Sequence, residues 1–130
     1  MKSFYWDHEF RDSDLDTFIS ISGDNALFHS SDQIAREHGF KRRICHGVMC
    51  LMPFSRYLGM EYPGNFYVIL EASSKFRHPV YTNSKLHYSL KEIFVNDSLG
   101  VSKLNGSISH ESLILVDATF TCQRLRNENS

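Results

Sequence analysis

Asp24 and His29 are the residues whose types and spacing first suggest chemistry, because a carboxylate here precedes an imidazole by five residues. Two such groups facing one water molecule can take a proton from it and deliver a proton elsewhere. Gly23 precedes the carboxylate where a helix would end, and glycine readily adopts the left-handed backbone of helix C-termini. On spacing alone, a turn in which Asp24 binds its own backbone, beside a hydrogen-bonded loop His29, is the commoner arrangement.

A second candidate group is His46-Gly47, which opens the apolar run Val48–Met52. Free N–H groups at a helix start can hold negative charge that develops on a carbonyl oxygen. The run predicts a helix from Gly47 to about Tyr57 that is buried because it is apolar on nearly all sides. Pro53 falls inside this helix and predicts a kink or a one-turn irregularity.

Helical patterns dominate the first half of the chain. Ser13 is the expected N-cap of a helix that presents an apolar face and ends at Gly23. Ser30 or Ser31 can cap a short second helix over 32–38, which Gly39 would stop. A short strand within residues 1–12 and a turn over 62–65 complete this half.

Strand patterns dominate the second half. The segment 66–76 is rich in strand-forming residues in its first half, and Leu86, Tyr88 and Leu90 alternate with polar residues. A strand through Val101 follows, which Asn105-Gly106 would end in a turn or bulge. A regular period-two face closes the pattern, made of Ile114, Val116, Ala118, Phe120 and Cys122. Helices followed by antiparallel strands indicate an α+β domain in which a sheet wraps an apolar helix.

The 130 residues predict one domain over 1–130, with a polar tail at about 124–130. The formal net charge of −1 gives no general attraction to nucleic acid or membranes, and neither partner is expected. The three cysteines lack a CxxC spacing and are expected to be free thiols in a reducing compartment. Since no signal peptide or membrane-length apolar run is visible, the expected location is the cytoplasm.

The run Phe-x-x-x-Ser-Gly-Asp-x-x-x-x-His that ends at His29, followed seventeen residues later by His46-Gly47, resembles the MaoC-like hydratases and dehydratases. This family includes the (R)-specific enoyl-CoA hydratases. The resemblance continues through Phe54-Ser55, Tyr62-Pro-Gly64 and Phe76-Arg-His-Pro-Val80, and so covers most of the chain. It implies the hotdog fold, a homodimer or higher homo-oligomer, and a pocket at the subunit interface.

The resemblance also implies roles for single residues. Asp24 would act as the base toward water, and His29 would relay the proton to the α-carbon of an enoyl thioester. The backbone N–H of Gly47 would meet the thioester carbonyl oxygen, Ser55 would add a supporting hydrogen bond, and His46 would orient the loop. For Gly47 the alternative is close packing alone, and for Ser55 it is a bond to its own helix backbone.

The loop between Asp24 and His29 departs from the family pattern of x-Asn-Pro-aliphatic, because Ala26 and Leu27 replace the Asn and Pro. Loss of the proline is expected to loosen a loop whose stiffness places His29. Lys41, Arg42, Arg43 and Arg77 are candidates to bind the phosphates of coenzyme A or of a carrier protein's phosphopantetheine arm, although a solvated charged loop is the commoner explanation. The remaining histidines lack metal-ligand spacing, so no metal is expected.

The leading hypothesis is therefore a hydro-lyase that interconverts trans-2-enoyl and (3R)-3-hydroxyacyl thioesters on coenzyme A or acyl carrier protein. It would need no cofactor beyond the carrier that forms part of the substrate. Two alternatives stay open. One is an acyl-thioesterase of the same fold, which the lack of an acidic residue between Gly47 and Tyr57 disfavours. The other is a catalytically weak acyl-thioester-binding subunit, which the altered loop favours.

Overall fold

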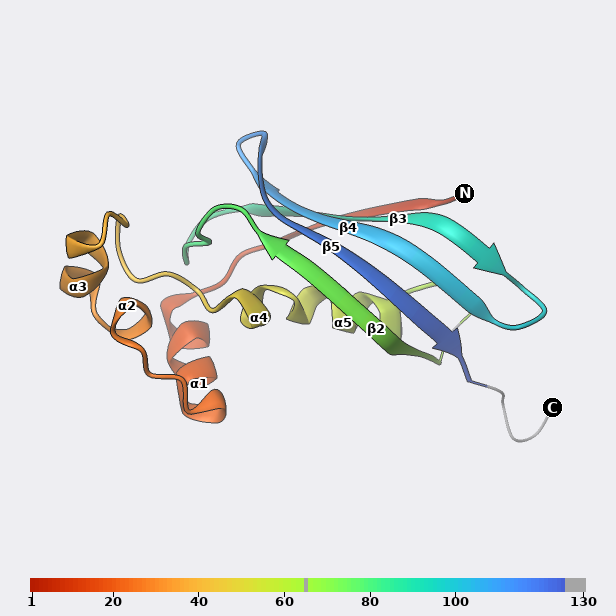
Figure 1. Ribbon diagram of the computed structural model, residues 1–130, viewed down its shortest axis with the longest axis horizontal. Helices are drawn as coiled ribbons and strands as arrows, with labels where there is room; N and C mark the ends of the chain where they lie inside the picture. The colour runs from red at the N-terminus through yellow and green to blue at the C-terminus, as the bar shows by residue number, and fades with distance from the viewer. Residues whose placement is uncertain (65, 126–130) are drawn as a thin grey trace.

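The computed structural model describes residues 1–64 and 66–125, and its largest element is a five-stranded antiparallel sheet. The strands follow the spatial order β1-β3-β4-β5-β2, so β1 and β2 form the two edges. Figure 1 shows the sheet curving over a helical layer that runs beneath it. The strands are β1 (Ser3–His8), β2 (Tyr67–Phe76), β3 (Leu86–Asn96), β4 (Val101–His110) and β5 (Leu113–Arg124).

The expected central helix is present as two consecutive pieces, α4 (Gly47–Cys50) and α5 (Met52–Met60), which meet at Leu51. Pro53 lies in the first turn of α5, where its missing N–H costs no helical hydrogen bond, so the predicted irregularity precedes the proline. The side that faces the sheet is buried, but Val48 and Met52 are exposed on the other side. The expectation of burial on nearly all sides was therefore wrong for the outer side.

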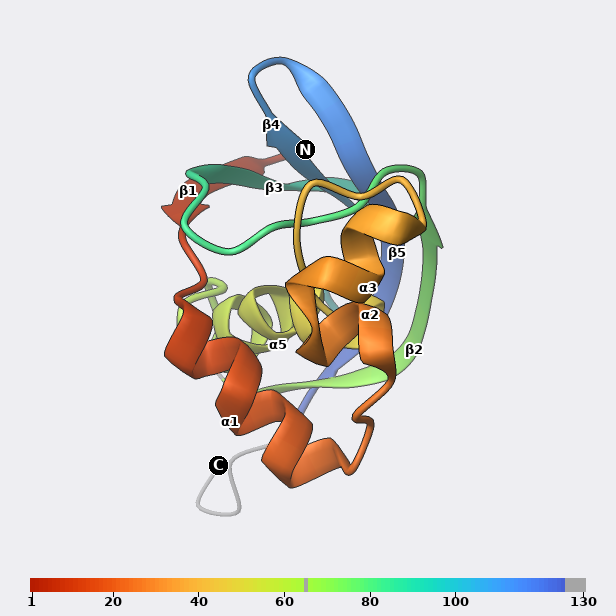
Figure 2. The same ribbon diagram turned by 90° about the vertical axis from the view of Figure 1, so that its left-hand side faces the viewer.

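Three further helices gather beyond one end of the sheet, next to the start of α4 (Figures 1 and 2). They are α1 (Asp12–Ser22), α2 (Leu27–Ser30) and α3 (Asp32–Glu37). Helix α1 begins before the predicted cap Ser13, because the carboxylate of Asp14 accepts the backbone N–H of Arg11 and stabilises an earlier first turn. Ser31 caps α3 through the backbone N–H of Ile34, as predicted.

The strand predictions held except at two places. Gly106 lies inside β4 instead of ending it, because the ring of Phe54 packs against its backbone where a side chain would stand. Ile114 is exposed, whereas Val116, Ala118, Phe120 and Cys122 of β5 are buried. A register shift between Ile108 and Ser109 of β4 inserts Leu115, which takes the buried position instead.

Several boundaries differ from the sequence-based expectations. Strand β2 extends through Phe76, and its register shift lies in the first half, between Ile69 and Glu71. Arg124, expected in the tail, is the last residue of β5, and residues 126–130 lie outside the described residues. Asn65 of the predicted 62–65 turn is likewise outside them. Within the described residues, no helix is both long and apolar enough to cross a bilayer.

Two glycine-to-alanine substitutions should have opposite effects on stability. A Cβ atom at Gly106 would stand 2.8 Å from the buried Phe54 ring, so Gly106→Ala should lower the free energy of unfolding by about 1–3 kcal/mol. A Cβ at Gly59 of α5 meets no atom within 4 Å, so Gly59→Ala should raise it by up to about 1 kcal/mol. Urea unfolding at fixed protein concentration measures both, and equal effects would refute the packing assigned to Gly106.

Candidate active site

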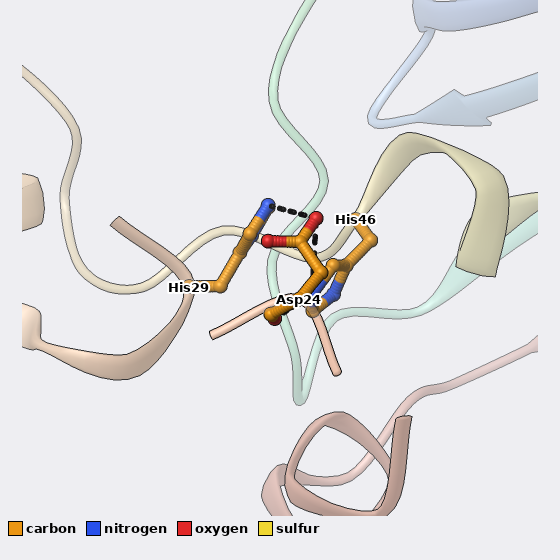
Figure 3. A group of neighbouring side chains, drawn as sticks. All are labelled: Asp24, His29 and His46. Atoms are coloured by element: carbon orange, nitrogen blue, oxygen red, sulfur yellow. Dashed lines mark hydrogen bonds and ion pairs between the residues drawn. The ribbon is translucent and has the colours of Figure 1, made fainter. Parts of the chain in front are cut away.

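Asp24 follows the end of α1, where Gly23 adopts the left-handed conformation with φ 73°. Its two carboxylate oxygens have different neighbours. Oδ1 accepts the backbone N–H of Ala26 at 3.2 Å and so starts α2. Oδ2 lies 4.0 Å from Nε2 of His29 and 3.9 Å from Nε2 of His46 (Figure 3). The backbone turn and the approach to the histidines, which the sequence presented as alternatives, therefore coexist in one side chain.

His29 lies on α2, a single helical turn that sequence reasoning missed. Its Nδ1 is 2.7 Å from the carbonyl oxygen of Ile44. Because a carbonyl oxygen only accepts, Nδ1 carries the proton, and Nε2 presents a lone pair toward Asp24. Burial lowers the pKa of His29 below its ordinary value, and neighbouring His46 lowers it further; the bond to Ile44 and the carboxylate of Asp24 act in the opposite direction.

His46 is the most buried member of the group, with an exposed fraction of 2%. Its Nε2 donates to the backbone carbonyl oxygen of Asp24 at 2.8 Å. The ring stacks on that of His29, with 3.7 Å between centroids and 17° between planes. Its centroid also lies 4.6 Å from that of the Phe18 ring on α1. His46 therefore holds the backbone of Asp24 in place, which agrees with the orienting role expected for it.

The gap of 4.0 Å between Oδ2 of Asp24 and Nε2 of His29 is too long for a direct hydrogen bond. One water molecule at about 2.8 Å from each atom can bridge such a gap. Ligand atoms of Asp24, His29 and His46 lie within 4.8 Å of one another, but Nε2 of His46 is occupied by the Asp24 carbonyl. Asp24 and His29 are then the two residues with a free ligand atom, fewer than the three or more protein ligands of a typical zinc site.

A cavity of about 560 Å³ opens onto this group. Gly47, the first residue of α4, lies in its wall, and a Cβ atom there would stand 2.9 Å from the ring of Phe76. Gly47 is therefore closely packed, and its backbone N–H, at the start of α4, lies beside the cavity. Most of the other lining side chains are apolar, including Phe28, Phe40, Ile44, Val48 and Val80.

The remaining predicted site residues are dispersed. Ser55 is exposed on α5 and does not line this cavity. Arg77 lines it and pairs with Asp117. Lys41, Arg42 and Arg43 lie outside the cavity.

Two of the three clustered cations already have partners in the fold. Arg43 pairs with Asp16 at 2.7 Å. Arg42 donates to the carbonyl oxygen of Thr82 at 2.6 Å and lies over the ring of Tyr81. Arg43 thus attaches its loop to α1, and Arg42 attaches the same loop to the one that contains Thr82. Their expected contact with phosphate stays a prediction.

Cys45 also lines the cavity, but burial raises the pKa of its thiol to about 12. A thiol with this pKa is almost fully protonated at neutral pH and is a poor nucleophile. Cys45 is therefore an inert thiol, one of the three cysteines expected to be free.

Three aromatic residues complete the site and were not assigned to it from the sequence. Phe18 packs on His46, Phe28 packs edge-on against His29 at 4.6 Å, and Phe76 covers Gly47. Phe18 and Phe76 belong to the motifs that carry the family resemblance, which was the available signal. Phe28 occupies the aliphatic position of the altered loop.

Comparison with known proteins gives consistent matches. The family model described as "MaoC like domain" matches residues 7–110. A mitochondrial 3-hydroxyacyl-[acyl-carrier-protein] dehydratase of Arabidopsis thaliana is 26% identical over 116 residues, which cover 86% of this chain and 69% of the relative. An (R)-specific enoyl-CoA hydratase of Rhodospirillum rubrum is 33% identical over 69 residues, covering 53% of this chain and 48% of the relative.

The solved structure of an (R)-hydratase from A. caviae involved in PHA biosynthesis superimposes with a TM-score of 0.87 at 20% identity. The match covers 95% of each chain. It confirms the predicted α+β hotdog fold, a central helix wrapped by a curved antiparallel sheet.

The environment of His29 can be tested by NMR titration of its ring. We expect a pKa below the ordinary 6.5, because burial disfavours the charged imidazolium. Asp24→Asn should lower this pKa further by removing the favourable carboxylate, and His46→Asn should raise it by removing the stacked ring whose electrostatic effect lowers it. If both variants moved the pKa of His29 in the same direction, the effects assigned to Asp24 and His46 would be wrong.

Proposed function

The chain belongs to the MaoC-like domain family, and on this premise we propose that it is a lyase that adds water to an enoyl thioester or removes it from a hydroxyacyl thioester. The observation that carries the proposal is the pair of free acceptor atoms, Oδ2 of Asp24 and Nε2 of His29, which face one another across 4.0 Å at the cavity wall. A single water fits between them, and hydration of a double bond requires one activated water.

In the hydration direction, the oxygen of the bound water forms a bond to the β-carbon. The Ile44 carbonyl oxygen keeps the ring proton of His29 on Nδ1. Nε2 is therefore free to take a proton from that water and to pass it to the α-carbon. Asp24 accepts a hydrogen bond from the other O–H, whose hydrogen stays on the product hydroxyl, and so polarises the water together with His29. The N–H of Gly47 stabilises the negative charge that develops on the thioester oxygen. Dehydration follows the reverse sequence.

For the substrate, we propose trans-2-enoyl and (3R)-3-hydroxyacyl thioesters of coenzyme A or acyl carrier protein. The relatives support this class, since one is named for a carrier-bound and the other for a CoA-bound substrate. The apolar lining of the cavity suits an acyl chain. The proposed reaction uses proton transfer alone and needs no metal or redox cofactor.

The altered loop does not by itself argue for a catalytically weak subunit. The carboxylate of Asp24 binds the N–H of Ala26, and the N–H of His29 binds the carbonyl of Ala26 at 2.8 Å. These two bonds hold α2 in the absence of the family proline. The thioesterase alternative stays disfavoured, because the residues of α4 and α5, from Gly47 to Met60, include no acid.

We further propose that the protein works as a homodimer or higher homo-oligomer. Strand β2 is an edge of the sheet, and Phe66, Val68, Leu70 and Phe76 on or beside it are exposed apolar residues. An exposed apolar edge strand favours pairing with another chain. Phe76 also lines the cavity, so a partner there would lie close to the active site.

The catalytic pair can be tested with trans-2-enoyl-CoA substrates of short and medium chain length. Asp24→Asn and His29→Ala should each lower kcat by roughly 10²–10⁴-fold, because each removes a group that moves or orients the proton. His38→Ala is the matched control, since His38 is exposed at the C-terminal cap of α3 and lies outside the cavity. Loss of the double bond and release of free thiol are recorded together, and thiol release without hydration would identify a thioesterase instead.

The proposed self-association can be tested by sedimentation. Leu70→Lys places a charge on the β2 edge and should shift the protein toward a smaller species. Leu99→Lys is the control, because Leu99 is similarly exposed but lies in the turn between β3 and β4. A wild-type monomer at micromolar concentration, or equal effects of both variants, would contradict association through β2.

A further inference from the structure

A polar hollow of about 360 Å³ lies on the sheet surface beside the end of β2, and we call it the β2 hollow. Side chains of three adjacent strands line it. They are Ser73, Lys75 and Arg77 on or just after β2, Asn105 on β4, and Asp117 and Thr119 on β5. Arg77 lines both the β2 hollow and the catalytic cavity, so the two spaces adjoin.

The alternation of side chains along a strand explains why the two spaces adjoin. Phe76 points to the face of the sheet that carries α4, where it packs on Gly47 in the wall of the catalytic cavity. Lys75 and Arg77 therefore point to the opposite face, about 7 Å apart along the chain. The thioester-binding side and the β2 hollow are separated only by the last residues of β2.

The charge of the β2 hollow is net positive. Lys75 stands opposite Asp117 in the register of β2 and β5, and the guanidinium of Arg77 pairs with the same carboxylate. One carboxylate thus faces two cations. The other lining groups are hydroxyls, an amide, Gly106 and the methyl group of Ala118, and Thr119 donates to Asn105 at 3.3 Å. This combination of two cations with neutral hydrogen-bonding groups suits a phosphate.

We propose that the β2 hollow binds a phosphate group of the substrate's pantetheine arm, with Lys75 and Arg77 as its cationic contacts, while the thioester occupies the catalytic cavity. The inference rests on the proposed function, because the arm is part of the thioester substrate. The Asp117 carboxylate fixes the direction of the Arg77 guanidinium, and Lys75 supplies the excess positive charge.

This placement differs from the basic cluster that the sequence suggested. Arg42 and Arg43 are engaged by Thr82 and Asp16, and neither lines the catalytic cavity or the β2 hollow. Lys75 was not singled out from the sequence, because an isolated lysine in a strand gives no signal until β5 places Asp117 opposite it and Arg77 next to a cavity.

The test compares three trans-2-enoyl thioesters that share one acyl group. The first is the CoA thioester, the second is the 4′-phosphopantetheine thioester, and the third is the phosphate-free pantetheine thioester. Lys75→Glu should lower kcat/KM for the CoA thioester, relative to the phosphate-free one, by about 10-fold at low salt. The change should appear in KM, and added salt should reduce the wild-type preference for the phosphate-bearing substrate.

Lys103→Glu is the matched control. Lys103 also points outward on β4, but it lies in the row of Thr121, about 13 Å along β5 from Asp117. It should leave the ratio between the substrates unchanged.

The outcomes separate the two proposals. A Lys75→Glu effect on both phosphate-bearing thioesters supports binding of the phosphate that coenzyme A and carrier proteins share. An effect on the CoA thioester alone supports binding of the other CoA phosphates. Hydration of all three thioesters with no change of ratio overturns the phosphate site but leaves the hydratase intact. Failure of the wild type to hydrate any of them overturns the proposed function.

Discussion

The hydrogen bond from buried His46 to the backbone carbonyl of Asp24 is the constraint on which the site depends. It joins the end of α1 to the start of α4, two points that are 22 residues apart in the chain. Since an unmade hydrogen bond at a buried group costs about 1–3 kcal/mol, the two ends are strongly held together. The stacking of His46 on His29 then adds α2 to the same point. Three helices that share little direct packing are thus fixed around one carboxylate.

The protonation state of the site follows from this arrangement. His29 is held in one tautomer by the Ile44 carbonyl, and burial keeps its pKa low. Two stacked imidazoles cannot both carry charge without mutual repulsion. A neutral His29 with a free Nε2 is therefore the resting form at neutral pH. Asp24 is half exposed, with a side-chain accessibility of 53%, so its carboxylate lies at the solvent side of the group and the two buried rings lie behind it.

Local sequence signals predicted the elements whose structure is set locally. Gly23 ends α1, Ser31 caps α3, and the alternation in β3 and β5 gives their buried faces, all from neighbouring residues. Features that depend on distant contacts were missed. Gly106 continues a strand because Phe54 of another element packs on it, and the His29 ring is oriented by the distant carbonyl of Ile44. The candidate pair was found through its motif, but its tautomer and the aromatic residues around it required the fold.

The contact between Gly47 and Phe76 has a consequence for how such a sequence can change over time. The two residues come from different halves of the fold, and an added methyl group at position 47 would stand 2.9 Å from the ring. While the Phe76 ring keeps this position, a side chain at position 47 would require the ring to shift. A smaller residue at position 76 removes that restriction. The order of substitutions therefore matters: a lineage that shortens residue 76 first can later explore other residues at the start of α4, and the reverse order passes through a disrupted cavity wall.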